Sequence, residues 1–214
     1  MSQPYEVIFE DDALLVVNKP AGLLAVPDSH DKTKPNLFTM LQAGRGWLAN
    51  VHRLDINTTG VFVCAKSPEA FRQFQQSVAG KFYVVLVQGA AEPVNIERNI
   101  DGKVACTITK LHERFRGFTL LDVEIKTGRT HQIRIHMQAT GTPVVGDADY
   151  GGEPLLLSQI KRDYKATGEE RPLLSRPALH AESLMLREPT RTFTAPWPKD
   201  LTVAVKYLRK YAGL

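Results

Sequence analysis

The chain has 214 residues, of which 43% are hydrophobic and 23% are charged, proportions that exclude a collagen-like chain, a coiled coil and a wholly disordered protein. The formal net charge is +4 and divides unevenly: residues 1–100 carry 9 basic and 10 acidic side chains, whereas residues 101–214 carry 18 and 13. The positive second half permits a polyanionic partner without establishing one, since an ordinary solvated surface could carry the same charge.

The pattern of apolar runs, caps and turn residues predicts a series of short strands and helices. In chain order these are strands at 5–9 and 13–17, a helix at 37–42, a strand at 61–65, a helix at 68–78, a strand at 82–87, two or three strands within 103–125, a helix at 131–140, a helix within 153–176, strands at 178–186 and 190–194, and a helix at 200–210. Because the strands come in hairpin-like groups without a regular βαβ alternation, the α+β class is favoured.

Several residues mark where the predicted helices begin and end. Ser67 and Pro68 are typical of an N-cap and a first helical residue, and Gly80 is expected to close that helix. Thr130 and Asp200 are the expected caps of two later helices. The β-branched residues at 132–135 leave a strand possible there.

The sequence also bears on location and on metals. The first residues lack the pattern of a secretory signal peptide, and no apolar run reaches the roughly 18 residues of a membrane span. Cys64 and Cys106 have no CxxC partner, which argues against structural zinc, and Cys64 lies in an apolar run that should be buried. We expect a cytoplasmic protein with reduced thiols and no membrane partner.

Asp55 is the first candidate for chemistry. It follows Arg53 just before a Thr/Gly turn, and an arginine beside a carboxylate favours the ionised form, which can act as a nucleophile or base. The alternative is a turn aspartate bonded to its own backbone. Arg129 stands at a predicted strand-to-helix junction, where it could bind phosphate, pair with a carboxylate or simply be exposed.

The sequence gives little support for a metal site or for a nucleotide-binding motif. His131 and His136 are five residues apart, so they diverge on a helix and face opposite sides of a strand. The acidic segment 147–152 lacks the further ligands of a calcium loop and is interpreted as a structural turn. Neither GxGxxG nor GxxxxGK[ST] is present.

Six segments in fixed order carry a resemblance to a known family. They are KPAG at 19–22, HRLD at 52–55, KFY at 81–83, TGRTHQIRIH at 127–136, GDADYG at 146–151 and LHAE at 179–182. Together they resemble the RluA-type pseudouridine synthase family over about residues 7–210. The resemblance implies a single catalytic domain, 1–214, with a mostly antiparallel mixed central sheet, flanking helices and loops, and two subdomains around a central catalytic cleft.

The resemblance also implies an activity and its residues. The family isomerises uridine to pseudouridine within RNA, without a cofactor or required metal. Asp55 would be the catalytic aspartate, Tyr83 would stack on the target base, and Arg129 would pair with Asp55. Arg53 would displace the target base from its stack. His52 and Lys81, in the same motifs, are further candidates for binding the substrate.

RNA affinity would have to come from the catalytic domain, since the first predicted strand leaves no room for the S4-like domain that many relatives carry before it. The candidate contacts to the RNA backbone are Lys32, Lys34, Lys161, Arg162 and Lys165. We expect a monomer that acts on a stem-loop of 23S rRNA or tRNA, with no DNA partner.

Two other functions stay open at the level of sequence. One is an RNA-binding or ribosome-assembly protein that needs no catalysis, although it would have little reason to keep Asp55, Tyr83 and Arg129 together. The other is a glycosidase-like hydrolase, which needs a second carboxylate that the sequence does not offer. Whether Asp55 would attack the sugar C1′ or remove a proton from C2′ is likewise undecided.

Overall fold

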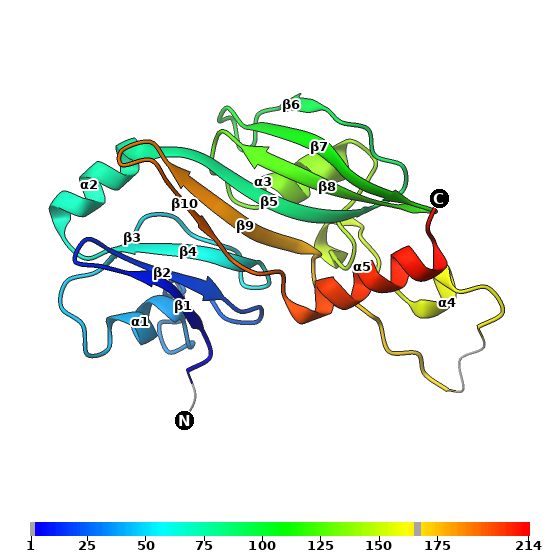
Figure 1. Ribbon diagram of the computed structural model, residues 1–214, viewed down its shortest axis with the longest axis horizontal. Coiled ribbons are helices and arrows are strands. Elements are labelled where there is room, and N and C mark those ends of the chain that lie inside the picture. Colours follow the sequence, from blue (N-terminus) through cyan, green and yellow to red (C-terminus); the bar gives the residue numbers. More distant parts are fainter. Residues whose placement is uncertain (1–2, 165–167) are drawn as a thin grey trace. The chain divides into compact units, whose positions relative to one another are not determined.

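The computed structural model describes residues 3–164 and 168–214 (Figure 1). It comprises two compact units, of which unit 1 is Met1–Lys81 with Ala181–Pro196 and unit 2 is Phe82–His180 with Trp197–Leu214. Two strands, β5 (Val78–Gln88) and β9 (Leu179–Leu186), each run from one unit into the other. Two of the three points where the chain passes between the units therefore fall inside strands, and the third, after Pro196, lies between β10 (Arg191–Thr194) and α5 (Lys199–Tyr211).

Unit 1 is built on the opening hairpin and the strands that extend it. Its other elements are β1 (Glu6–Glu10), β2 (Leu14–Lys19), α1 (Leu37–Gln42), β3 (Ala49–Asn50), β4 (Thr59–Ala65), α2 (Pro68–Ser77) and β10 (Arg191–Thr194). The strand order is β1-β2-β4-β9, with β3 paired to β4 and β10 paired to β9. Every residue of β4 is buried, as expected for a continuous apolar run with both faces covered.

Helix α2 closes one side of the unit 1 core, and its start follows the sequence prediction. The Ser67 side chain accepts a hydrogen bond from the backbone N–H of Ala70 at 3.1 Å, and Pro68 is the first helical residue. Ala70 and Phe74, one turn apart, join the core cluster formed with β2, β4, β9 and β10.

Unit 2 contains the second set of strands and most of the helices. Its other elements are β6 (Asn95–Glu97), β7 (Cys106–Phe115), β8 (Phe118–Ile125), α3 (Gln132–Ala139), the 3₁₀ turn η1 (Ala148–Tyr150), α4 (Leu157–Ile160) and α5 (Lys199–Tyr211). The strand order is β5-β8-β7-β6, and β7 pairs with both β6 and β8 in antiparallel fashion. Helix α5 buries Leu201, Ala204 and Leu208 along one face, at the spacing of an amphipathic helix.

Three predicted helix boundaries are wrong. Gly80 does not close α2, because the helix ends at Ser77 and the chain enters β5 directly. Thr130 does not cap α3, because the N-cap is His131 in the left-handed region, with φ 54°. Asp200 does not cap α5, which begins one residue earlier, and its carboxylate instead accepts two hydrogen bonds from Arg176 at 2.7 and 2.8 Å.

The predicted class is confirmed: the fold is α+β, with a mostly antiparallel mixed sheet and a few flanking helices. The structure also confirms four predicted elements: the opening hairpin, the helix at 37–42, the hairpin within 103–125, and a helix rather than a strand at 132–139. Of the helices that the structure describes, none has the length and apolar character needed to cross a bilayer.

Candidate active site

Asp55 lies in unit 1, in the loop that joins β3 to β4. Leu54 beside it is buried, whereas Asp55 itself is half-buried. The Asp55 carbonyl accepts a hydrogen bond from the backbone N–H of Thr58 at 3.1 Å, which closes a tight turn before β4. The aspartate is therefore carried on a short, hydrogen-bonded turn at the edge of a buried strand.

A fully buried lysine side chain is hydrogen-bonded to the backbone of this turn. Lys19, the last residue of β2, has 0% exposure and donates from Nζ to the carbonyls of Pro20, Ile56 and Thr58 at 2.9, 2.8 and 3.0 Å. Three carbonyl oxygens offset the loss of water around the ammonium group. Because two of the three belong to residues 56 and 58, Lys19 fixes the backbone that carries Asp55.

Gly60 lets strand β4 approach β9 closely just after this turn. Its φ is +114°, and a Cβ added there would lie 2.1 Å from the Ala181 carbonyl oxygen. Any other residue would have to push the two strands apart. The glycine of the predicted Thr/Gly turn is thus required by packing within unit 1.

The His52 ring is turned toward β4. Its Nε2 accepts a hydrogen bond from the backbone N–H of Val63 at 3.3 Å, and its Nδ1 is buried without a partner among the described residues. Burial, with a smaller effect from the charge of Lys81, lowers the pKa of His52 to about 3. The imidazole is therefore neutral at physiological pH, and its proton resides on Nδ1.

The other motif residues lie on the same loop and on β5. Arg53 is exposed beside Asp55. Lys81 and Tyr83 are two residues apart on β5, so strand alternation sends both to one face. Burial lowers the pKa of the half-buried Lys81, and Tyr83 is 7% exposed. Tyr83 belongs to unit 2 and Lys81 to unit 1.

Gln132 organises the loop that carries Arg129 in unit 2. Its Oε1 accepts hydrogen bonds from the Thr127 hydroxyl at 2.7 Å and from the Arg129 backbone N–H at 3.0 Å. Its Nε2 donates to the Cys106 carbonyl at 2.9 Å. The Arg129 side chain is exposed, and its Nε donates to the Val104 carbonyl at 3.0 Å.

Arg134 is the buried arginine of the same motif. Its Nε and Nη2 donate to the two carboxylate oxygens of Asp147 at 2.6 Å each, and Nη2 also donates to Asp149 at 2.8 Å. The guanidinium lies 4.7 Å from the centre of the Tyr150 ring, and the Tyr150 hydroxyl is 3.0 Å from Nδ1 of His131. This network joins α3 to η1 and holds the left-handed residue that begins the helix.

Sequence reasoning missed Lys19, Gln132 and Arg134. A charged residue at the end of an otherwise apolar strand was the available signal for Lys19. The segment 147–152 is a turn, as predicted, but the interpretation did not foresee that Asp147 would be fully buried against Arg134. His136 is also buried, and its ring nitrogens contact the Thr107 hydroxyl and the Arg98 carbonyl at 2.9 and 3.1 Å.

The residues predicted to bind RNA phosphate lie in different parts of the chain. Lys32 and Lys34 are exposed in unit 1, where Lys34 is 3.5 Å from Asp28. Lys161 is half-buried and Arg162 is exposed in unit 2. Lys165 falls outside the described residues. Within the described ranges, no three His, Cys, Asp or Glu side chains gather as ligands for a metal ion.

The predicted site residues divide between the units. Arg53, Asp55, His52 and Lys81 belong to unit 1, and Tyr83 and Arg129 belong to unit 2. Chemically, they offer a carboxylate on a fixed turn, an exposed guanidinium beside it, and an aromatic ring. A carboxylate can act as a nucleophile or base, a guanidinium can fill the place of an extruded base, and an aromatic ring can stack on one.

Comparison with known proteins identifies the chemistry. A family model described as RNA pseudouridylate synthase matches residues 13–139. Ribosomal large subunit pseudouridine synthase D of Xanthomonas campestris pv. campestris is 35% identical, over 97% of this chain and 70% of that protein. The protein of the same name from Pseudomonas aeruginosa is 34% identical, over 96% of this chain and 72% of that protein.

Solved structures agree in fold. Human RNA Pseudouridylate Synthase Domain Containing 4 has a TM-score of 0.69 at 23% identity, covering 95% of this chain and 93% of that one. Human RNA Pseudouridylate Synthase Domain Containing 1 has a TM-score of 0.64 at 24% identity, covering 91% and 84%. The family match spans more than half of the chain and confirms the RluA-type resemblance. The chain therefore belongs to the RNA pseudouridylate synthase family, whose enzymes isomerise uridine to pseudouridine in RNA.

Proposed function

We propose that this enzyme uses Asp55 to isomerise uridines in structured 23S rRNA or tRNA. The observation that carries the proposal is the Asp55 turn, which Lys19 fixes through the carbonyls of Ile56 and Thr58. A reacting carboxylate gains most when its backbone is held in place before the substrate arrives. The relatives named for the large ribosomal subunit favour rRNA as the substrate.

The reaction needs no redox partner, since it is an isomerisation. The N1–C1′ glycosidic bond of the uridine breaks, the base turns, and a C5–C1′ bond forms. The hydrogen on C5 leaves and N1 gains one, so that atoms and charge balance. Asp55 serves either by attacking C1′ or by removing a proton from C2′, and both routes require its ionised form.

The other motif residues have roles before and around this step. Extruding the target base from its stack costs a few kcal/mol, and the exposed guanidinium of Arg53 is suited to fill the space left behind. Stacking on the Tyr83 ring supplies roughly 1–3 kcal/mol per base. We place Lys81 near the substrate on the Tyr83 side of β5, and His52 as a neutral group that orders the loop.

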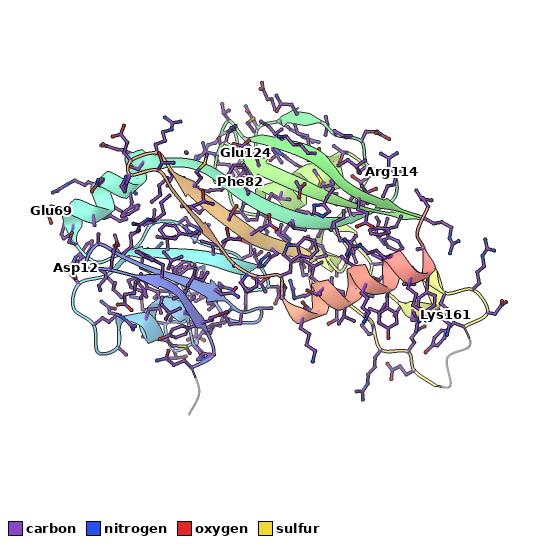
Figure 2. The ribbon with its side chains drawn as sticks, viewed as in Figure 1. Asp12, Glu69, Phe82, Arg114, Glu124 and Lys161 are labelled. Atoms are coloured by element: carbon purple, nitrogen blue, oxygen red, sulfur yellow. The ribbon has the colours of Figure 1, made fainter. Side chains whose placement is uncertain are left out.

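Replacing Asp55 by Asn tests the proposal. The amide has nearly the same shape but cannot act as a nucleophile or base, so modification of RNA should be lost while the thermal stability is kept. Asp12→Asn is the matched control, because Asp12 is an exposed aspartate in a turn of the same unit (Figure 2). Mapping pseudouridines in rRNA and tRNA from cells with each variant identifies the substrate, and retained modification with Asp55→Asn would refute the proposal.

The arginine that assists Asp55 has two candidates. The family resemblance assigns Arg129, whereas burial favours Arg134 of the same motif, since Arg129 is exposed and bonded to Val104. If Arg129 pairs with Asp55, Arg129→Gln should lower the single-turnover rate by about 100-fold or more at unchanged stability. An unchanged rate would transfer the role to Arg134.

A further inference from the structure

A small cationic pocket lies in unit 2, away from the motif residues in sequence. It has a volume of about 280 Å³ and is lined by Arg116, Ser158, Gln159, Ile160, Lys161 and Arg162. Among the residues that the structure describes, the lining includes three cationic side chains and two neutral polar ones, and no carboxylate. Helix α4 contributes much of it and lies beside the C-terminal end of α5, as Figure 1 shows. The volume lies just below the range that is typical of pockets for drug-sized ligands.

Arg116 is built into the wall of this pocket. It stands in the turn between β7 and β8, and its Nη2 donates to the carbonyls of Ile160 and Tyr211 at 3.1 Å each. One guanidinium thus ties the β7–β8 turn to the ends of α4 and α5. Both bonds use Nη2, so the guanidinium plane is oriented. Among the described residues, Nε and Nη1 donate no further hydrogen bond and can therefore donate to an anion.

Lys161 is positioned by aromatic rings. Its Nζ lies 5.5 Å from the ring centres of both Tyr164 and Tyr211, and Lys210 Nζ lies 5.1 Å from Tyr211 (Figure 2 labels Lys161). Cation–π contacts orient the ammonium group without neutralising its charge. Within residues 3–164 and 168–214, neither Lys161 nor Arg162 forms an ion pair with a carboxylate.

Two acidic side chains near the pocket, Glu170 and Asp163, offset part of this charge. Glu170 accepts a hydrogen bond from the Ser158 backbone N–H at 2.9 Å, and Asp163 follows Arg162 in the chain. Glu113 is held by Arg209 at 2.7 Å. The pocket thus combines a fixed guanidinium, an oriented ammonium and an exposed arginine, which suits an anion with several oxygen acceptors.

We propose that this pocket binds a phosphate of the RNA backbone and so anchors the substrate at a second point. The identity of the ligand rests on the proposed function, because an enzyme that acts on RNA meets that polyanion with every substrate. Contacts of this kind position an RNA and carry little sequence information. The proposal extends the role expected of Lys161 and Arg162 to a defined site that includes Arg116.

The test compares two double variants in binding a labelled RNA stem-loop with single-stranded flanks, measured from 50 to 200 mM salt. Lys161→Gln with Arg162→Gln should weaken binding several-fold and reduce the slope of log K against log salt by about 1 to 2. Arg72→Gln with Lys110→Gln removes the same charge from exposed positions elsewhere and should change the slope much less. Arg162→Gln alone removes an exposed side chain, so it tests the pocket without disturbing the rings around Lys161.

Catalysis separates this proposal from the assignment of Asp55. At saturating RNA the pocket variant should keep the single-turnover rate of the wild type and need only a higher RNA concentration, whereas Asp55→Asn should bind normally without turnover. If Asp55→Asn keeps its activity but the pocket variant binds weakly, the pocket stands and the assignment of Asp55 fails. Wild-type affinity and salt slope in both pocket variants would overturn the phosphate site.

Discussion

At the scale of single residues, His52 shows how burial fixes a protonation state. Its Nδ1 is buried and carries the proton, and its Nε2, where a second proton would have to bind, already accepts a hydrogen bond from the Val63 N–H. Burial and the charge of Lys81 therefore lower the pKa of His52 to about 3. This motif histidine is therefore a neutral group in the loop before Asp55.

This protonation state makes the stability depend on pH. Below pH 6.5 the unfolded chain binds a proton at residue 52 that the folded chain does not, so the free energy of unfolding falls as the pH decreases from 6.5 toward 3, by up to about 1.4 kcal/mol per pH unit. His52→Asn should flatten this dependence by one proton between pH 6 and 4. Urea unfolding across that range measures the slope.

Exposed His30 supplies the control for that measurement. His30→Asn should leave the slope of the free energy of unfolding against pH close to that of the wild type. Burial also lowers the pKa of His136, which is present in all three proteins and adds equally to each slope. Equal slopes for His52→Asn and the wild type would show that residue 52 titrates alike in both states.

The residues that position the site were harder to foresee than the residues in it. Asp55 stands out because its motif is contiguous in the chain. Lys19 contacts carbonyls 37 and 39 residues away, and Gln132 contacts the Cys106 carbonyl 26 residues away. A lysine or glutamine in a sequence does not indicate which distant backbone group it will meet, so these supports become visible only in the fold.

At the scale of elements, the junction of α3 and η1 depends on one buried ion pair. Asp147 has 0% exposure and takes both of its hydrogen bonds from Arg134, whereas the Asp149 side chain is 75% exposed. Asp147→Asn would remove the fully buried carboxylate that accepts hydrogen bonds from Nε and Nη2 of Arg134, and should destabilise the fold by about 3 kcal/mol or more. Asp149→Asn should change the stability by less than about 1 kcal/mol.

Thermal unfolding of the two variants checks this difference. Since both remove one negative charge from the same 3₁₀ turn, any effect of net charge is shared, and only the burial of the carboxylate differs. The Asp147 variant should also lose activity, because the loop that carries Arg129 leads directly into α3. Equal melting temperatures would show that Asp149 can replace Asp147 as the partner of Arg134.

Elements set by local patterns were predictable, and those set by distant partners were not. The Ser67 cap and the 118–125 strand follow from neighbouring residues alone. The expected caps Thr130 and Asp200 failed where distant partners act: Gln132 at the start of α3 donates to the Cys106 carbonyl, and Arg176 engages the Asp200 carboxylate. Local preference is overridden where a buried or charged group needs its partner.

At the scale of the whole molecule, the chain leaves unit 1 and returns to it within strands. Residues 82–180 separate the two segments of unit 1; these two crossings fall inside β5 and β9, and a third crossing, after Pro196, falls between β10 and α5. The proposed residues follow the same division, with Asp55 in unit 1 and Tyr83 in unit 2. Chain order alone does not place such residues together, which is why their pairing is proposed from the family motifs.

The shared strands predict that the two units unfold together. Unfolding either unit would remove part of β5 and part of β9 from the other, so partly folded states should be poorly populated. The two tryptophans report on this separately, because Trp47 belongs to unit 1 and Trp197 to unit 2. Trp47→Phe and Trp197→Phe each leave one fluorescent reporter. In each variant, the urea midpoint measured by tryptophan fluorescence should equal the midpoint measured by circular dichroism. A fluorescence midpoint at lower urea than the dichroism midpoint would show that the unit holding that tryptophan unfolds alone.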